Sequence, residues 1–353
     1  MPRFLHRDAI SSIGQNFLLP VLSILAALGL GALILGISGY DVAKAYGALW
    51  QGVFGNIRNL GEAFLISTPL LFIGAGIAVA FRCGIWNIGA DGQFYLGAIG
   101  GTVVGLYLQN LPPFVGIPLG LIVGFLAGGL WGGIAGWLKV RFKANEVVTT
   151  IMLNYVAIGL VGYLITGPMQ ESSHTAPQTN EIGANMVLPG ILPPTRIHLG
   201  YIFALIFVVV IAFILFRTPL GYSLQAVGFN REAARHAGIK VEATYITAML
   251  ISGGAAGIAG AVEVMGITGR LYANISAGYG FTGIAVSLLA GNNPLGTIIT
   301  GWLFGALNSG SQLMQMTAQI PSVVVYIVQG LVIVFLVSFK VMSKKLRLLR
   351  VGG

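Results

Sequence analysis

The sequence predicts an all-α fold, a polytopic transmembrane helical bundle of about ten spans with both termini in the cytoplasm. Three observations predict it: only 8% of the 353 residues are charged, 56% are hydrophobic, and apolar runs of about 20 residues recur along the chain. A soluble domain has roughly a quarter of its residues charged. Lipid is therefore the expected solvent for most of this chain, and residues 1–353 are expected to form a single transmembrane domain.

Nine apolar runs have the length of a membrane-spanning helix. They are 17–38, 63–80, 94–108, 114–140, 147–165, 199–216, 244–265, 295–314 and 323–339. A tenth run, 281–290, is too short to cross the bilayer by itself. It either begins earlier, near Ala277, or is re-entrant, which is tolerated only where protein or water shields its backbone.

The distribution of basic residues predicts the orientation. With ten crossings, all but four of the 19 Lys and Arg residues lie on the cytoplasmic side, as the positive-inside rule requires. The four on the opposite side are Lys44, Arg58, Arg196 and Arg270. Nine crossings would place the basic C-terminal cluster outside, so we reject that count. The net charge of +9 thus indicates an anionic cytoplasmic membrane face and no nucleic-acid partner.

Two external segments stand out. Residues 40–59 have spaced apolar side chains and few charges, which is typical of a short helix lying in the membrane interface. Residues 168–198 form the longest loop, which is polar and rich in proline. This external loop is either a docking surface for a partner or a solvated linker.

Glycines recur every fourth residue in several predicted spans. A glycine stripe on one helix face lets another backbone approach closely, and such contacts replace the hydrophobic drive that lipid does not provide. The stripes comprise Gly116, Gly120, Gly124, Gly128, Gly132 and Gly136, then Gly97, Gly101 and Gly105, then Gly253 and Gly257. They predict a compact bundle, whether the helices slide or are statically packed.

The sequence contains no constellation of catalytic residues. There is no P-loop, no H-E-x-x-H and no G-x-S-x-G, and the four histidines are scattered. The single cysteine, Cys83, excludes an intramolecular disulfide and a Cys-based metal site. We therefore expect no enzyme activity and no bound metal.

A short helix is predicted within the cytoplasmic segment 217–243. Asn230 is a good N-cap, Glu232 sits favourably in the first turn, and Gly238 is a natural C-terminal stop. A helix of about two turns is unstable alone, so it needs a partner. Its alanines, Ala233 and Ala234, offer a smooth surface for that partner.

Basic side chains flank these alanines and can pair with acidic residues at the edge of the partner's binding surface. The residues expected to contact the partner are Asn230, Arg231, Glu232, Ala233, Ala234, Arg235 and Gly238.

Three motifs in order resemble a known family. Glu232-Ala233-Ala234 with Gly238 resembles the EAA-x-x-x-G coupling loop of ABC importer permeases. Residues 84–93 are similar to the element between the second and third spans of branched-chain amino acid, ribose and nucleoside permeases. Residues 143–155 match the nucleoside branch, although that branch more often has Phe, Glu and Tyr at the positions of Trp86, Asp91 and His236. The resemblance covers roughly residues 60 to 340.

The resemblance implies the permease subunit of an ATP-driven nucleoside importer in a bacterial inner membrane. It implies a separate ATPase that uses the ATP, a second permease subunit, identical or similar, and a periplasmic or lipoprotein binding protein; no cofactor is expected on this chain. A ribose or branched-chain amino acid permease is the alternative within the family. An ion-coupled secondary carrier is the alternative from another class, and the scarcity of buried acidic residues argues against it.

Polar and aromatic residues at membrane depth are the candidates for the substrate pathway, because aromatic rings stack on bases and amides bond their edges. They are Trp86, Asn87, Asp91, Gln93, Phe94, Asn154, Glu263 and Asn308. Glu263 is the acidic residue that lies clearly within a span, and an intramembrane charge indicates function by default. It lies on the pathway or makes a structural bond; Arg270 is the partner that the sequence suggests.

Overall fold

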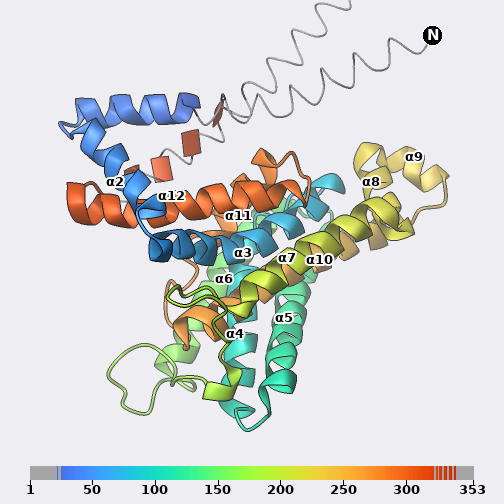
Figure 1. Ribbon diagram of the computed structural model, residues 1–353. Coiled ribbons are helices and arrows are strands. Elements are labelled where there is room, and N and C mark those ends of the chain that lie inside the picture. Colours follow the sequence, from blue (N-terminus) through green and yellow to red (C-terminus); the bar gives the residue numbers. More distant parts are fainter. Residues whose placement is uncertain are drawn as a thin grey trace, which may run out of the picture. The chain divides into compact units, whose positions relative to one another are not determined.

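The computed structural model describes residues 25–321 throughout, together with Leu22 and separate positions between 323 and 338. Every regular element in this part is helical, and its two β-bridges are isolated pairs. The helices are Leu25–Ile37, α2 (Val42–Phe54), α3 (Ile57–Arg82), α4 (Ala90–Tyr107), α5 (Pro113–Phe142), α6 (Glu146–Thr166), α7 (Leu199–Arg217), α8 (Pro219–Phe229), α9 (Arg231–His236), α10 (Val241–Glu263), α11 (Tyr279–Leu289) and α12 (Gly296–Ala318), with a π-helical turn at Val264–Thr268 and a 3-10 turn at Ala184–Met186 (Figure 1).

Among the described residues, five helices are long and apolar enough to cross a membrane: α3, α5, α6, α7 and α10 with its π-helical turn. They contain the predicted spans 63–80, 114–140, 147–165, 199–216 and 244–265, so long apolar helices are confirmed at these positions. Helices α4 and α12 cover most of the predicted spans 94–108 and 295–314. The doubtful run 281–290 corresponds to α11, which has 11 residues. Much of the predicted spans 17–38 and 323–339 lies outside the described residues.

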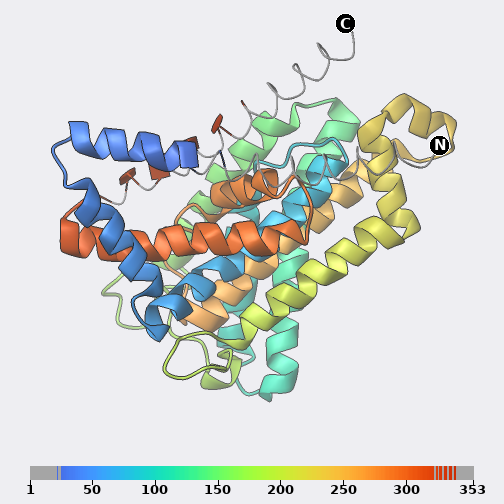
Figure 2. The same ribbon diagram turned by 45° about the horizontal axis from the view of Figure 1, so that its top comes forward.

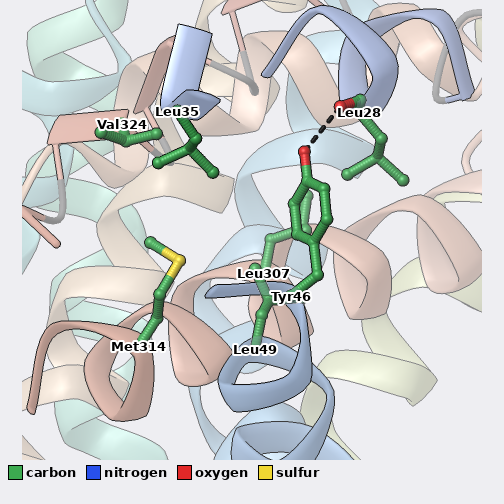
Figure 3. A pocket seen from close by; sticks show the side chains of 7 residues that line it. All are labelled: Leu28, Leu35, Tyr46, Leu49, Leu307, Met314 and Val324. Atoms are coloured by element: carbon green, nitrogen blue, oxygen red, sulfur yellow. Dashed lines mark hydrogen bonds between the residues drawn. The ribbon is translucent and has the colours of Figure 1, made fainter. Parts of the chain in front are cut away.

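Two compact units make up the chain. One consists of Met1–Leu60 and Leu307–Gly353, and the other of Gly61–Ala306. In the first unit, α2 forms within the predicted interfacial segment 40–59, and Gly52 on α2 lies against the backbone of Gly310. Figure 3 shows an apolar pocket in this unit whose lining residues are Leu28, Leu35, Tyr46, Leu49, Leu307, Met314 and Val324. The Tyr46 hydroxyl donates to the Leu28 carbonyl at 2.6 Å, so the pocket offers no free polar group to a ligand.

The larger unit, Gly61–Ala306, is organised around backbone contacts of α10 with α4 and α5 (Figure 2). A Cβ placed on Gly257 of α10 would run into the carbonyl of Gly124, and one on Gly97 of α4 would run into Gly257 itself. A Cβ on Gly132 would come within 2.6 Å of the Met249 carbonyl. The predicted glycine stripes therefore meet one another, and the prediction of close helix packing is confirmed.

Two glycines of the α5 stripe face other partners. Gly116 lies against Met186, which belongs to the external loop, and Gly120 lies against Met265 at the end of α10. The same stripe thus fixes two helices and a loop. The sequence showed the stripe but not this division of its contacts.

Replacing Gly257 by alanine is expected to destabilise the protein beyond the ~1–3 kcal/mol typical of overpacking, because the methyl group meets fixed backbone atoms that cannot rotate away. The melting temperature in detergent, followed by size-exclusion chromatography after heating, measures this effect. Gly159→Ala on α6 is the matched control, since no atom lies within 4 Å of its Cβ position. Equal melting temperatures for the two variants would show that the contact between the glycine stripes is not tight.

Candidate functional site

Residues 218–238, which we call the foot, form two short helices at one end of the larger unit. Thr218 caps α8 by accepting a hydrogen bond from the Gly221 amide at 3.3 Å, and Pro219 occupies the first turn, where a missing N–H costs nothing. Asn230 caps α9 by accepting from the amides of Glu232 and Ala233 at 3.0 and 3.1 Å. Gly238 follows the helix with φ +83°, a conformation that favours glycine. The predicted N-cap and stop are confirmed.

The two alanines of the foot do not form one surface. Ala234 is buried in the core of the larger unit, whereas Ala233 is exposed. A six-residue helix turns one face inward to gain packing, and Ala234 lies on that face. The prediction that both alanines face a partner is therefore wrong for Ala234.

The charged side chains of the foot partly neutralise one another. Arg235 contacts Glu232 at 3.4 Å and Glu242 at 2.6 Å, and Arg231 contacts Glu232 at 3.2 Å. All these side chains are exposed, so each pair contributes little to stability. The basic surface expected from the sequence is thus a network of basic and acidic side chains.

An exposed aromatic residue of the foot was missed by the sequence analysis. Phe229 is 88% exposed at the end of α8, directly before the Asn230 cap, and Tyr222 is also exposed. A large apolar side chain held in water on a short helix is typical of an interface anchor. The sequence did contain a signal for this residue. A large aromatic residue directly before an N-cap in a polar segment is unusual for a solvated loop and indicates a contact with a partner.

Arg82, at the end of α3, ties the foot to other elements of the larger unit. Its guanidinium donates to the Gln225 side chain at 3.1 Å and to the Asn292 carbonyl at 2.6 Å. The Gly228 Cα packs against the carbonyl of Arg82 so closely that no side chain would fit. The foot therefore contacts α3 directly and, through one side chain, the turn that follows α11.

The connector between α3 and α4 holds a closed set of hydrogen bonds. The Asn87 amide nitrogen donates to the Gln93 oxygen at 2.8 Å and to the Ser252 hydroxyl at 2.9 Å, while its oxygen accepts from Gln93 at 3.0 Å and from the Gly89 amide at 3.0 Å. Asn87, Gln93 and Ser252 are all buried. Their polar groups bond to one another, so the arrangement fixes the connector against α10.

Asn154 bonds to the same connector from α6. Its oxygen accepts from the Gly92 amide at 2.8 Å, and its nitrogen donates to the Ile88 carbonyl at 3.0 Å. The structure thus brings Asn87, Gln93 and Asn154 together. It places them around irregular backbone whose polar groups need partners.

Asp91 joins this connector to the beginning of α11. One carboxylate oxygen accepts from the Ser276 hydroxyl at 2.6 Å and from the Gly280 amide at 2.8 Å. Phe94 is buried, and its ring lies 5.9 Å from that of Tyr279. Two segments nearly 190 residues apart therefore meet at Asp91. The sequence could not show this contact.

Three candidates lie apart from the connector bonds. Trp86 is half exposed and packs on Phe81, with ring centroids 4.6 Å apart. Asn308 lies on α12 in the other compact unit. Glu263 is buried at the end of α10, and its Oε2 has no hydrogen-bond partner among the described residues.

Arg270, which the sequence suggested as the partner of Glu263, pairs elsewhere. It contacts Glu181, and its second guanidinium nitrogen lies 3.8 Å from Glu171. Both acids belong to the external loop. The suggested Glu263–Arg270 pair is therefore wrong, because the glycine turn at Gly269 directs Arg270 toward the loop.

The external loop is bonded to the segment that follows α10. The Thr179 amide donates to the Leu271 carbonyl at 2.9 Å, that of Ile182 to Gly269 at 2.9 Å, and that of Leu188 to Met265 at 2.7 Å. A loop so bonded is not a solvated linker, although these contacts leave its docking role untested. In both views it lies at the end of the larger unit opposite α8 and α9 (Figures 1 and 2).

Comparisons with known proteins agree on one family. The model described as "Branched-chain amino acid transport system / permease component" matches residues 59–337. The guanosine ABC transporter permease protein NupP of Bacillus subtilis is 40% identical over 92% of this chain and 94% of its own length. The glucose ABC transporter permease protein TsgB13 of Haloferax volcanii is 33% identical over 90% of this chain and 86% of its own length. The nucleoside ABC transporter permease protein NupB of Lactococcus lactis is 31% identical over 91% of both chains.

Acidification is expected to loosen the external loop through Glu171. Hydrogen bonds from Thr175, Gln178 and Ser173 lower the pKa of this carboxyl from its ordinary 4.5 to about 2. Because the pKa is depressed in the folded loop, the stability it contributes is present above pH 4.5 and is lost as the pH falls toward 2. Cleavage of the loop by pepsin should therefore accelerate across this window.

The control for this experiment is Glu171→Gln, which cannot titrate. Its cleavage rate relative to an unfolded peptide should not change between pH 4.5 and 2. A wild-type loop whose relative cleavage is also constant would show that the bonds to Glu171 do not hold the loop.

Proposed function

Because this chain belongs to the family of branched-chain amino acid transport system permease components, we propose that it is the membrane-spanning permease subunit of a bacterial ATP-driven nucleoside importer. It is a helical, multi-pass membrane protein. Relatives named for guanosine and nucleosides, at 40% and 31% identity over nearly the whole chain, support this substrate class. A relative named for glucose makes a sugar the second candidate substrate. Uptake of a pentose or hexose that carries no base would test this candidate.

The proposed topology has ten crossings in the inner membrane, with both termini in the cytoplasm. The foot then lies inside and the external loop outside. Their positions at opposite ends of the larger unit support this arrangement. On this topology, α3 ends at the cytoplasmic face with Arg82, and the turn at Asn292 lies beside it.

The foot is the proposed contact with the ATPase subunit, which binds and hydrolyses the ATP. The observation that carries this proposal is the exposure of Phe229 and Ala233 on short helices whose other face, at Ala234, is anchored in the core. A partner that grips the exposed face can move the foot as a unit. Arg82 then carries the movement to α3 and to the end of α11.

The complete importer needs further subunits. A second permease subunit, identical or similar, would face this one across the pathway, and a periplasmic or lipoprotein binding protein would deliver the substrate to the outer side. Asn87, Gln93 and Asn154 are proposed to position the connector, and Asp91 to hold α11 against it. Trp86, Phe94, Glu263 and Asn308 remain proposed members of the pathway.

Replacing Phe229 by alanine removes apolar contact at the centre of the proposed ATPase interface, and replacing Ala233 by arginine places a large charged side chain there. Either change should therefore abolish nucleoside uptake. A truncated interface anchor typically costs ~2 kcal/mol or more, about a 30-fold loss of ATPase association. Co-purification of the ATPase with the permease from membranes measures the association. Uptake of labelled nucleoside by the same cells measures the transport.

The control is Arg141→Ala, an exposed change near the end of α5, which should alter neither quantity. Yields of the foot variants in the membrane should equal that of the wild type, since both replaced side chains are exposed. Normal ATPase co-purification with the Ala233→Arg and Phe229→Ala variants would remove the foot from the interface.

A further inference from the structure

The segment between α10 and α11 repeats the pattern of the connector between α3 and α4. Residues 87–94 and 274–281 both read Asn-Ile-x-Ala-x-x-x-Phe. Each copy follows a long helix and leads into the next one, α4 or α11. The copies touch where Asp91 of the first accepts from Ser276 and Gly280 of the second.

The two copies differ in exposure. In the first copy, Asn87 and Phe94 are completely buried. In the second copy, Asn274 is exposed and Phe281 is 52% exposed, and the neighbouring Tyr272 is 37% exposed. The second copy therefore presents an amide and two aromatic rings on the surface of the larger unit.

The bonds at its two ends give the depth of this segment on the proposed topology. After α11, Asn292 is bonded to Arg82 at the cytoplasmic end of α3. The 11 residues of α11 rise about 16 Å, so α11 begins near the middle of a hydrocarbon core about 30 Å thick. At the other end, Leu271 is bonded to Thr179 of the external loop. Residues 271–278 thus cross the outer half of the membrane without helical structure.

Such a backbone cannot face lipid. Peptide groups outside a helix lack internal partners, and irregular segments at membrane depth occur only where protein covers them or water fills a cavity beside them. The exposed residues here include Asn274, whose amide would lose its hydrogen bonds in hydrocarbon. Water beside this face satisfies both requirements.

We propose that Tyr272, Asn274 and Phe281, which we call the second-copy strip, line the translocation pathway and bind the nucleoside in its outer half. The flat faces of the aromatic rings suit stacking on a base, and the Asn274 amide can both donate to and accept from a base edge. Asp91 holds the strip through the Ser276 and Gly280 bonds and need not contact substrate. This inference rests on the proposed nucleoside importer.

The first test is water accessibility in the assembled transporter. Cys83 is the single cysteine and is buried, so Cys83→Ala provides a cysteine-free background. A charged methanethiosulfonate reagent added from outside should label an Asn274→Cys variant at least about tenfold faster than a Phe213→Cys variant, because thiolates form in water and not in lipid. Phe213 is the matched control, since it is 61% exposed on α7 at membrane depth. Saturating nucleoside should slow the labelling of Asn274→Cys.

The second test is transport. Phe281→Ala should raise the KM for nucleoside uptake about tenfold through loss of stacking, with unchanged ATPase co-purification. Phe281→Tyr, which keeps the ring, should restore a near-wild-type KM, and Phe213→Ala should leave the KM unaltered. Equally slow labelling of Asn274→Cys and Phe213→Cys would overturn the pathway assignment, because a second permease subunit or lipid then covers the strip. Labelling that nucleoside does not slow, in a complex that transports nucleoside, would overturn the binding site.

These outcomes differ from a failure of the proposed function. A wild-type complex that takes up no nucleoside, or that binds no ATPase, overturns the proposed importer whatever the labelling shows. Fast labelling of Asn274→Cys in that complex would still support a water-lined strip.

Discussion

Contact between backbones is the interaction on which this structure depends. In lipid, apolar side chains gain little by leaving one apolar surface for another, so helices associate through close packing and hydrogen bonds. Gly97, Gly124 and Gly257 bring α4, α5 and α10 to separations at which even a methyl group does not fit. Helix α10 is therefore fixed between two neighbours; the foot lies before it in the chain and residues 264–278 lie after it.

Polar groups inside the bundle serve the irregular backbone. Residues 83–89 and residues 269–278 both leave helical geometry, and each stretch frees amides and carbonyls that must find partners. Asn87 accepts from the Gly89 amide and Asn154 donates to the Ile88 carbonyl, both in the first stretch. Asp91 holds the second stretch through the Ser276 hydroxyl and the Gly280 amide in the first turn of α11. The chemistry of these side chains is the same as that expected of substrate contacts, which explains why the sequence alone did not separate the two roles.

Features that depend on neighbouring residues could be predicted from the sequence. The lengths of the apolar runs predicted the positions of α3, α5, α6, α7 and α10. The four-residue glycine spacing predicted close helix packing, and the Asn230 cap and Gly238 stop predicted the bounds of α9.

Contacts across long distances in the sequence could not be predicted in this way. The bond from Asn87 to Ser252 joins segments that share no local pattern. The pattern shared by residues 87–94 and 274–281 does not itself indicate that Asp91 contacts Gly280. The burial of Ala234 could not be predicted, because the six residues of α9 are too few to show which face is apolar. The contact of Arg270 with Glu181 could not be predicted, because it depends on how the external loop folds back. The place of the 274–281 copy, opposite the first, follows from the fold and not from its residues alone.

Arg82 links the foot to the turn that follows α11. One guanidinium is bonded to Gln225 in the foot and to Asn292 in the turn that follows α11. A displacement of the foot by a few ångströms must either pull that turn with it or separate the bonded atoms. The motions of the foot and of this turn are therefore coupled while both bonds persist, and a force applied to the foot would reach the end of α11 through a single side chain.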